Sequence, residues 1–123
     1  MPPQKTTILI VDDEPLHLKL YSWILEAQGY DCKTALVSRD SVDWPSDAHI
    51  DLALLDYRLS SSLTAIEVAG MLKDKFPSVP IVVLSELFGM PHDMGEHAIA
   101  FVNKGNPQHL VDTVKSITQA KLL

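Results

Sequence analysis

Residues 8–14 of the chain read ILIVDDE, four aliphatic residues followed directly by three carboxylates. An unbroken aliphatic run of this length predicts a strand buried on both faces, as in a parallel sheet. The like charge that follows it has two interpretations. Asp12 and Asp13 could cap the next helix, or they could gather a positively charged group. Other segments of the chain decide between these interpretations.

Four more aliphatic runs follow at the spacing of βα units. They are CKTAL at 32–36, LALL at 52–55, IVVL at 81–84 and AIAFV at 98–102. Together with the first run they predict an α/β fold of the (βα)5 type, a doubly wound five-stranded parallel sheet. We expect the 123 residues to form one domain, 1–123, with a core of about residues 6–120.

Three stretches have helical periodicity. The first has Pro15 in its opening turn, and its expected buried stripe consists of Leu16, Leu20, Ile24 and Ala27. The second begins at Thr64 and Glu67, which have capping-box spacing. The third begins after Asn106, a residue type that favours the N-cap.

Two of the segments between strands have weak helical patterns. Residues 37–49 offer only Val42 and Trp44 as apolar anchors before Pro45, so we expect a short helix there. Residues 86–97 are interrupted by two glycines and a proline. They predict a loop or a single turn, so the fourth helix of the fold should be shortened or missing.

Composition excludes several classes of protein. The chain is 46% hydrophobic with a net charge of −6, which is typical of a globular domain and argues against direct binding of nucleic acid. No apolar run approaches the ~18 residues of a membrane span, and residues 1–7 lack the apolar core of a signal peptide. We therefore expect a cytoplasmic protein that does not interact with a membrane.

The carboxyl ends of the predicted parallel strands gather polar side chains on one rim of the sheet. These side chains are Asp12, Asp13, Asp56, Ser85 and Lys104. Three carboxylates within ~4 Å of one another would repel by several kcal/mol even at an effective dielectric of ~20. Mg²⁺, which binds through carboxylates, waters and phosphate oxygens, would neutralise them. Lys104 would supply a second positive charge suited to a phosphoryl oxygen.

Four segments on these strand ends carry a resemblance to a known family. ILIVDDEP at 8–15, LALLDYRL at 52–59, IVVLSE at 81–86 and AFVNKG at 100–105 resemble the signature segments of the response-regulator receiver domain of two-component signalling. They occur in the family's order and extend over nearly the whole chain. The resemblance implies a CheY-like, flavodoxin-like fold. It also implies a switch that is no enzyme beyond catalysing its own phosphoryl transfer and dephosphorylation.

The resemblance also implies a role for each acid on the rim. Asp56 would be the phosphoacceptor, taking a phosphoryl group from the phosphohistidine of a sensor histidine kinase or a phosphotransfer protein. Asp13, Asp56 and the backbone carbonyl of Arg58 would hold Mg²⁺, with Asp12 acting through water. Capping would be a second role for Asp13, and Glu14 would lie in the first turn of the helix.

The remaining roles concern the phosphorylated state. By the same resemblance Ser85 would bond one phosphoryl oxygen, Lys104 would pair with another, and Phe101 would occupy the switch position. The added charge of about −1.5 to −2 would draw in Ser85 and let Phe101 turn inward. Such a switch is a shift between two populations of conformers.

The interval between Ser85 and Lys104 is a few residues shorter than is usual in the family. Most of the fourth helix would therefore be missing. In many receivers that helix forms the dimerisation surface, together with the fifth strand and the fifth helix. We expect a stand-alone receiver, or the terminal receiver of a hybrid kinase, that docks to a downstream protein. The apolar residues of the shortened loop are the expected docking surface: Leu87, Phe88 and Met90.

Two other functions stay open. Glu86 follows Ser85 where a small residue is usual, which permits a receiver-like interaction module that is never phosphorylated. An aspartyl-phosphate hydrolase of the haloacid-dehalogenase kind would need a second aspartate at position 58, where the chain has Arg58. The five histidines show no metal-binding spacing, and we expect all of them, His17 included, to be surface or loop residues.

Overall fold

The computed structural model describes residues 5–46, 49–59, 62–86 and 89–121. Its elements follow in the order β1 (Thr7–Asp12), α1 (Pro15–Glu26), β2 (Asp31–Ser38), β3 (Ser41–Asp43), β4 (Leu52–Asp56), α2 (Ala65–Lys75), β5 (Ile81–Ser85), η1 (His92–Met94), β6 (Ala100–Asn103) and α3 (Pro107–Lys121). The sheet has six strands in the order β3-β2-β1-β4-β5-β6. Five of them are parallel and match the predicted strands, while the short edge strand β3 is antiparallel to β2.

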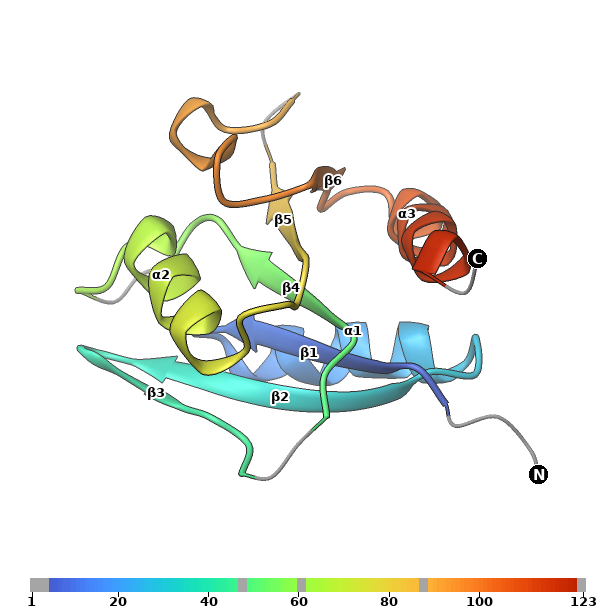
Figure 1. Ribbon diagram of the computed structural model, residues 1–123, viewed down its shortest axis with the longest axis horizontal. Coiled ribbons are helices and arrows are strands. Elements are labelled where there is room, and N and C mark those ends of the chain that lie inside the picture. Colours follow the sequence, from blue (N-terminus) through green and yellow to red (C-terminus); the bar gives the residue numbers. More distant parts are fainter. Residues whose placement is uncertain (1–4, 47–48, 60–61, 87–88, 122–123) are drawn as a thin grey trace.

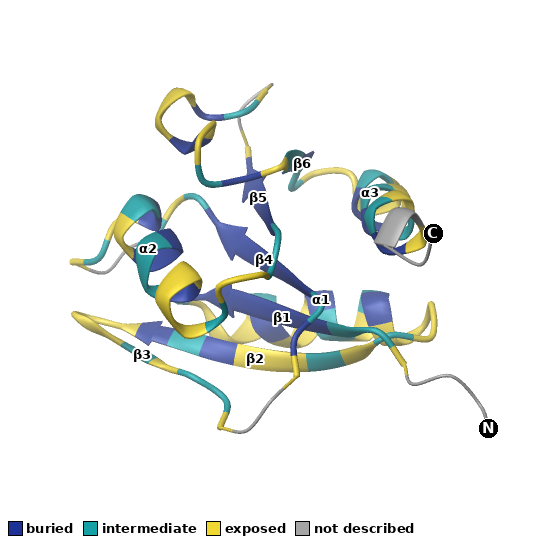
Figure 2. Cartoon of the chain, in the orientation of Figure 1, coloured by how far each residue is buried: buried dark blue, intermediate teal, exposed yellow. Residues whose placement is uncertain are grey.

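Helices cover both faces of the sheet (Figure 1). α1 and α3 pack on one face, where β1, β4 and β5 contribute alternate side chains to an apolar core. α2 and the single turn η1 pack on the other face, over a second apolar core. All residues of β4 and β5 are buried, as Figure 2 shows, because central strands of a parallel sheet are covered on both sides. The predicted α/β fold is therefore confirmed.

Two helix starts have the caps that the sequence predicts. The Thr64 hydroxyl accepts the Glu67 backbone N–H, and the Glu67 carboxylate accepts the Thr64 backbone N–H, which completes a capping box. At α3, Asn106 Oδ1 accepts the backbone N–H of His109 at 3.0 Å. Between β5 and β6 the described residues form only η1, so the fourth helix is reduced to a single turn as expected.

The predicted buried stripe of α1 is wrong except at Ile24, which is partly buried against the core on the α1 side. Leu16 and Leu20 are 72% and 47% exposed, and the buried face is formed instead by Leu18, Tyr21 and Leu25. The helix PLHLKLYSWILE has apolar residues on more than one side, so its pattern does not determine which side faces the sheet. The strand-to-helix connection sets that orientation, and it leaves apolar side chains of α1 in contact with solvent.

The short helix expected in residues 37–49 is also absent from the described part of that segment. A two-residue turn at Arg39 and Asp40 reverses the chain, and β3 pairs with β2 in the register Ser38↔Ser41. Arg39 has a φ of 46°, a left-handed conformation that such tight hairpin turns require. The predicted anchors Val42 and Trp44 still pack against the core on the α2 side, but from a strand and its extension.

Among the residues that the structure describes, no helix combines the length and the apolar character that crossing a bilayer would require.

Candidate functional site

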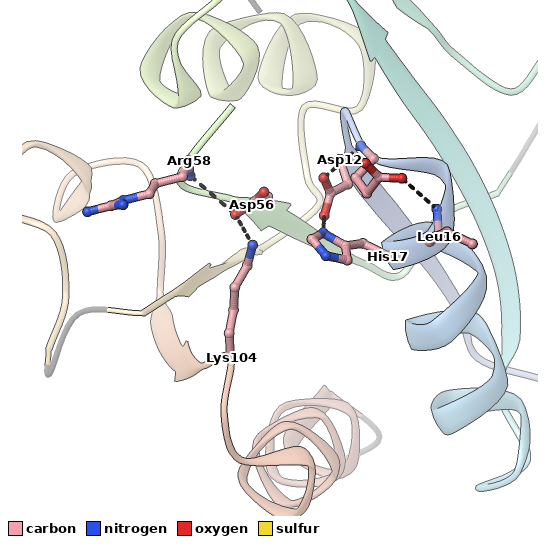
Figure 3. Close-up of polar contacts among 7 residues, drawn as sticks. Asp12, Leu16, His17, Asp56, Arg58 and Lys104 are labelled. Atoms are coloured by element: carbon pink, nitrogen blue, oxygen red, sulfur yellow. Dashed lines mark hydrogen bonds and ion pairs between the residues drawn. The ribbon is translucent and has the colours of Figure 1, made fainter. Parts of the chain in front are cut away.

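The candidate site lies at the carboxyl edge of the sheet, where β1 and β4 end (Figure 3). Its side chains come from four places in the chain: the end of β1, the end of β4, the first turn of α1, and the turn that follows β6. Because parallel strands all end at the same edge, the fold brings together residues up to 92 positions apart, as between Asp12 and Lys104.

Asp12 is the last residue of β1 and is only 1% exposed. Its Oδ1 accepts the backbone N–H of Glu14 at 3.0 Å. Its Oδ2 lies 3.3 Å from His17 Nδ1, a contact that is an ion pair only where the imidazole is protonated. Asp12 Oδ2 and His17 Nδ1 are both buried, and neither has a hydrogen-bond partner within the described chain. Asp12 is therefore a buried acid whose two oxygens have unequal surroundings.

Asp56 ends β4, is 2% exposed, and forms the strongest contact of the site. Its Oδ1 lies 2.7 Å from Lys104 Nζ, in a pair whose side chains are 3% and 14% exposed. The same oxygen accepts the backbone N–H of Arg58 at 3.2 Å. The Lys104 backbone is itself anchored, since its N–H donates to the Ser85 carbonyl at 2.9 Å. Lys104 therefore places a positive charge directly on the Asp56 carboxylate.

The electrostatics of the site reflect two buried acids that share one lysine. Burial, and next the charge of Asp56, raise the pKa of Asp12 from 3.8 to about 7. Burial lowers the pKa of Lys104. The hydrogen bond and charge of Asp56, together with the charge of Asp12, raise it by more than burial lowers it, so that the net shift is upward. The charge of Lys104 is thus shared by two buried acids, and a further cation at the rim would favour ionisation of both.

The structure brings Asp12, Asp56 and Lys104 together as the sequence predicts. Ser85, at the end of β5, is 2% exposed and borders the same edge of the sheet. Phe101, in β6, is half-buried, packs against the core on the α2 side, and meets the His109 ring edge-on at 6.2 Å. The switch roles of Ser85 and Phe101 stay predictions, because one conformation cannot test them.

Asp13 and Glu14 divide the work at the start of α1 differently from the sequence prediction. The N-cap is Glu14, whose Oε1 accepts the Leu16 backbone N–H at 3.2 Å, and not Asp13. Asp13 is half-buried beside Asp12, and their side chains are hydrogen-bonded. Its predicted role as a metal ligand remains untested.

His17 is the residue that the sequence interpretation placed wrongly. One ligand atom each of Asp12, His17 and Asp56 lie within 4.8 Å of one another, a grouping that could hold a metal ion. Part of the signal was available: α1 starts two residues after Asp13, and side chains of a first turn lean toward the helix N-terminus and so toward the strand end. The rotation of the helix about its axis selects His17 among them. A search for paired histidines misses this arrangement.

The predicted docking loop is only partly visible. Leu87 and Phe88 lie outside the described residues, while Met90 is half-buried and packs against the core on the α2 side. The exposed large apolar residues of the described chain lie mainly on α1 instead: Leu16, Leu20 and Trp23, the last being 61% exposed. We call these three residues the α1 patch.

This fold, with paired acids and a lysine at the carboxyl edge of the sheet, defines a class of signalling domains. The chain belongs to the family of the response regulator receiver domain, whose family model matches residues 8–115. The predicted family is confirmed.

Two relatives illustrate the range of lengths in the family. The nitrogen assimilation regulatory protein NtrX of Azorhizobium caulinodans is 34% identical over 99 residues, which cover 80% of this chain but 21% of NtrX. The chain thus spans about a fifth of that relative. The polar-differentiation response regulator DivK of Brucella ovis is 29% identical over 71% of each chain.

Solved structures agree with this assignment. The response regulator TrrA of Thermotoga maritima, solved in complex with Mg²⁺-BeF, is 26% identical with a TM-score of 0.72, and the match covers 91% of this chain and 98% of TrrA. TrrA has also been solved in complex with the histidine kinase ThkA, and that match has 27% identity, a TM-score of 0.74 and coverage of 91% and 97%. The chemotaxis protein CheY4 of Vibrio cholerae, 20% identical with a TM-score of 0.77 over 93% and 99% of the chains, shares the fold.

Proposed function

We propose that the chain is a phosphoacceptor switch, in which Asp56 takes a phosphoryl group from the phosphohistidine of a sensor histidine kinase or a phosphotransfer protein. One observation carries the proposal: the buried Asp56 carboxylate is held 2.7 Å from Lys104 Nζ beside the second buried acid, Asp12. A structural ion pair would not need Asp12, whose burial next to Asp56 is unfavourable.

In the proposed transfer a carboxylate oxygen of Asp56 attacks phosphorus. The new P–O bond forms as the P–N bond to the donor imidazole breaks, and the imidazole leaves with the electron pair and then takes up a proton. Lys104 reduces the repulsion between the Asp56 carboxylate and the incoming phosphoryl oxygens. After transfer its ammonium group would pair with a phosphoryl oxygen, and Ser85 would donate a hydrogen bond to another.

The residues of the rim fit a divalent cation, because a buried Asp12 oxygen has no hydrogen-bond partner among the described residues, and ligand atoms of Asp12 and Asp56 lie within 4.8 Å of each other. Asp12, Asp13, Asp56 and the Arg58 carbonyl would hold Mg²⁺, the ion present in the TrrA complex. When bound, Mg²⁺ neutralises phosphoryl charge and helps to orient the group for in-line transfer. The acids would hold that ion, while Lys104 contacts Asp56 directly through its ammonium group.

The first experiment is phosphorylation in vitro. Incubation with Mg²⁺ and acetyl phosphate should add one phosphoryl group by intact mass, and Asp56→Asn should abolish the addition. Asp51→Asn, which changes the aspartate at the other end of β4, is the matched control and should be labelled like the wild type. No labelling of the wild type, under conditions that label an ordinary receiver domain, would favour the unphosphorylated interaction module.

We also propose that the α1 patch contacts the donor protein. α1 begins directly beside Asp12, so a protein docked there would bring its phosphohistidine to the rim, and TrrA forms a complex with a kinase. Exposed Leu and Trp side chains in one helix are typical of such interfaces. The predicted loop surface at 87–90 remains a second candidate, for the downstream partner.

Two phosphoryl donors, a phosphorylated kinase and acetyl phosphate, separate the effect of docking from the effect of catalysis. Leu16→Ser with Trp23→Ala should slow transfer from autophosphorylated kinases while leaving labelling by acetyl phosphate unchanged, since a small donor needs no docking surface. Ile99→Ser, which changes an exposed apolar residue next to β6, is a control for general loss of surface hydrophobicity. Equal slowing with both donors would show that the α1 patch does not act by docking.

A further inference from the structure

His17 gives the acidic rim a nitrogen atom where its other side-chain ligands are oxygens. The residue lies in the first turn of α1, and its imidazole points back to the end of β1 (Figure 3). Its Nδ1 is buried, although the side chain as a whole is 43% exposed. The ring therefore has one nitrogen directed into the site and an open side toward solvent.

The geometry between His17 and Asp12 does not satisfy either group by itself. Nδ1 and Oδ2 are 3.3 Å apart, yet neither atom has a hydrogen-bond partner in the described chain. Asp12 is 1% exposed, so bulk water does not satisfy its oxygen either. A buried carboxylate oxygen and a buried imidazole nitrogen left in this way each carry a desolvation cost that a shared ligand would remove.

The distances match a shared metal ion. Two ligand atoms that are each about 2.1 Å from a metal lie about 3.0–3.4 Å apart when they occupy neighbouring coordination positions. The 3.3 Å between His17 Nδ1 and Asp12 Oδ2 falls in this range. One ligand atom each of Asp12, His17 and Asp56 lie within 4.8 Å of one another, so a small movement would make Asp56 the third ligand.

We propose that His17 Nδ1, Asp12 and Asp56 form a binding site for a borderline first-row divalent cation of the Co²⁺, Ni²⁺ and Zn²⁺ class. Such ions accept imidazole nitrogen readily, whereas Mg²⁺ prefers oxygen ligands and keeps most of its waters. The site overlaps the Mg²⁺ site of the proposed function and so rests on the same acidic rim. His17 makes the rim selective: it strengthens binding of the nitrogen-accepting ions and contributes nothing to Mg²⁺.

Metal affinity of the unphosphorylated chain tests this assignment. Isothermal titration calorimetry measures the affinity for CoCl₂ and, separately, for MgCl₂. The Co²⁺ affinity of His17→Leu should be at least about tenfold weaker than that of the wild type. The Mg²⁺ affinity should be the same in both proteins, which also shows that the variant is folded. Phosphorylation with Mg²⁺ is measured apart, so failure of the metal assignment and failure of the phosphoacceptor proposal give different results.

The chain offers a matched control at the other end of β4. His49 Nε2 lies 2.9 Å from Asp51 Oδ1, so this second histidine–aspartate pair resembles the first in composition, but its histidine is 75% exposed. His49→Leu should leave the Co²⁺ affinity of the rim unchanged. If His49→Leu weakens Co²⁺ binding as much as His17→Leu, the binding is adventitious surface coordination and the proposal is overturned.

A spectroscopic measurement identifies the ligand directly. In the Co²⁺-loaded wild type, the imidazole N–H proton of a ligating histidine should give a strongly paramagnetically shifted NMR signal that exchanges with solvent, and His17→Leu should lose it. An unchanged signal in His17→Leu would overturn the assignment. Equal losses of Co²⁺ and Mg²⁺ affinity in that variant would also overturn it, because they would mean that His17 only positions Asp12.

Discussion

The two ends of strand β4 each carry an aspartate with a histidine nearby, in opposite surroundings. Before the strand, Asp51 accepts the Thr7 backbone N–H at 2.9 Å and meets the exposed His49. Its side chain is 23% exposed, so water shares in its solvation. After the strand, Asp56 is almost fully buried beside the equally buried Asp12, and its ion pair in the described chain is with Lys104.

The difference separates an aspartate whose contacts stabilise the fold from one whose burial opposes stability. At the Asp51 end a single acid has two polar partners, the Thr7 backbone N–H and the His49 imidazole. At the Asp56 end two acids compete for one lysine, and one of their oxygens has no hydrogen-bond partner among the described residues. Folding alone does not favour this arrangement, because removing acids from water next to each other opposes stability. The function proposed for the carboxyl end would account for the arrangement.

The largest expected effect concerns Asp12. Its pKa of about 7 in the fold exceeds the ordinary 3.8, so between these pH values the folded chain holds a proton that the unfolded chain has released. Stability should therefore fall as pH rises from 3.8 toward 7 and stay low above it, by up to about 4 kcal/mol. In EDTA at pH 8, Asp12→Asn should be more stable than the wild type by a large part of that amount.

Urea unfolding from pH 4 to pH 8 measures this difference. Asp51→Asn should keep the decline of the wild type, because Asp12 is intact in it, whereas Asp12→Asn should lose most of the decline. If the stability of the wild type and that of Asp12→Asn change with pH in the same way, Asp12 does not cause the decline. The two ends of β4 would then not differ in their electrostatics in this way.

A somewhat smaller effect is expected from Lys104. Lys104→Met leaves Asp56 buried without its counter-charge, and loss of one partner of a buried ion pair typically destabilises by about 3 kcal/mol or more. His49→Leu removes a pair whose histidine is 75% exposed, and should change stability by less than about 1 kcal/mol. Both free energies of unfolding can be measured in urea at pH 7 with EDTA.

A double variant separates loss of the charge partner from loss of packing. Asp56→Asn combined with Lys104→Met leaves no charge unpaired, so it should recover much of the stability that Lys104→Met loses. If the double variant is as unstable as Lys104→Met, the lysine stabilises the fold through its methylene chain, and the ion pair has little energetic weight.

The same contrast shows what the sequence could predict. Strand positions were accessible because fully buried parallel strands read as unbroken aliphatic runs, and Asp12, Asp56 and Lys104 follow from where those runs end. The orientation of α1 was not accessible, because Leu16 and Leu20 are as apolar as the buried Leu18 and Leu25. Tertiary contacts decide between the two stripes.

The hairpin of β2 and β3 and the position of His17 escaped for related reasons. The turn depends on Arg39 adopting a left-handed conformation, which its residue type does not signal. His17 joins the site through the rotation of α1 about its axis, and that rotation is the feature that the apolar pattern misassigned. When the buried face of a helix is assigned wrongly, the site residues in its first turn are therefore misplaced as well.

The smallest expected effect lies at Asp51. Asp51→Ala leaves the Thr7 backbone N–H without its acceptor at the start of the sheet and should cost about 1 kcal/mol, while Asp51→Asn keeps an acceptor oxygen and should stay within about 0.5 kcal/mol of the wild type. Urea unfolding at pH 7 measures both variants. Because Asp51 lies at the opposite end of β4 from the rim, neither variant should alter labelling by acetyl phosphate or the affinity for Mg²⁺. A change in either property would mean that the two ends of the strand are coupled, and that Asp51 is more than a link between β1 and the loop before β4.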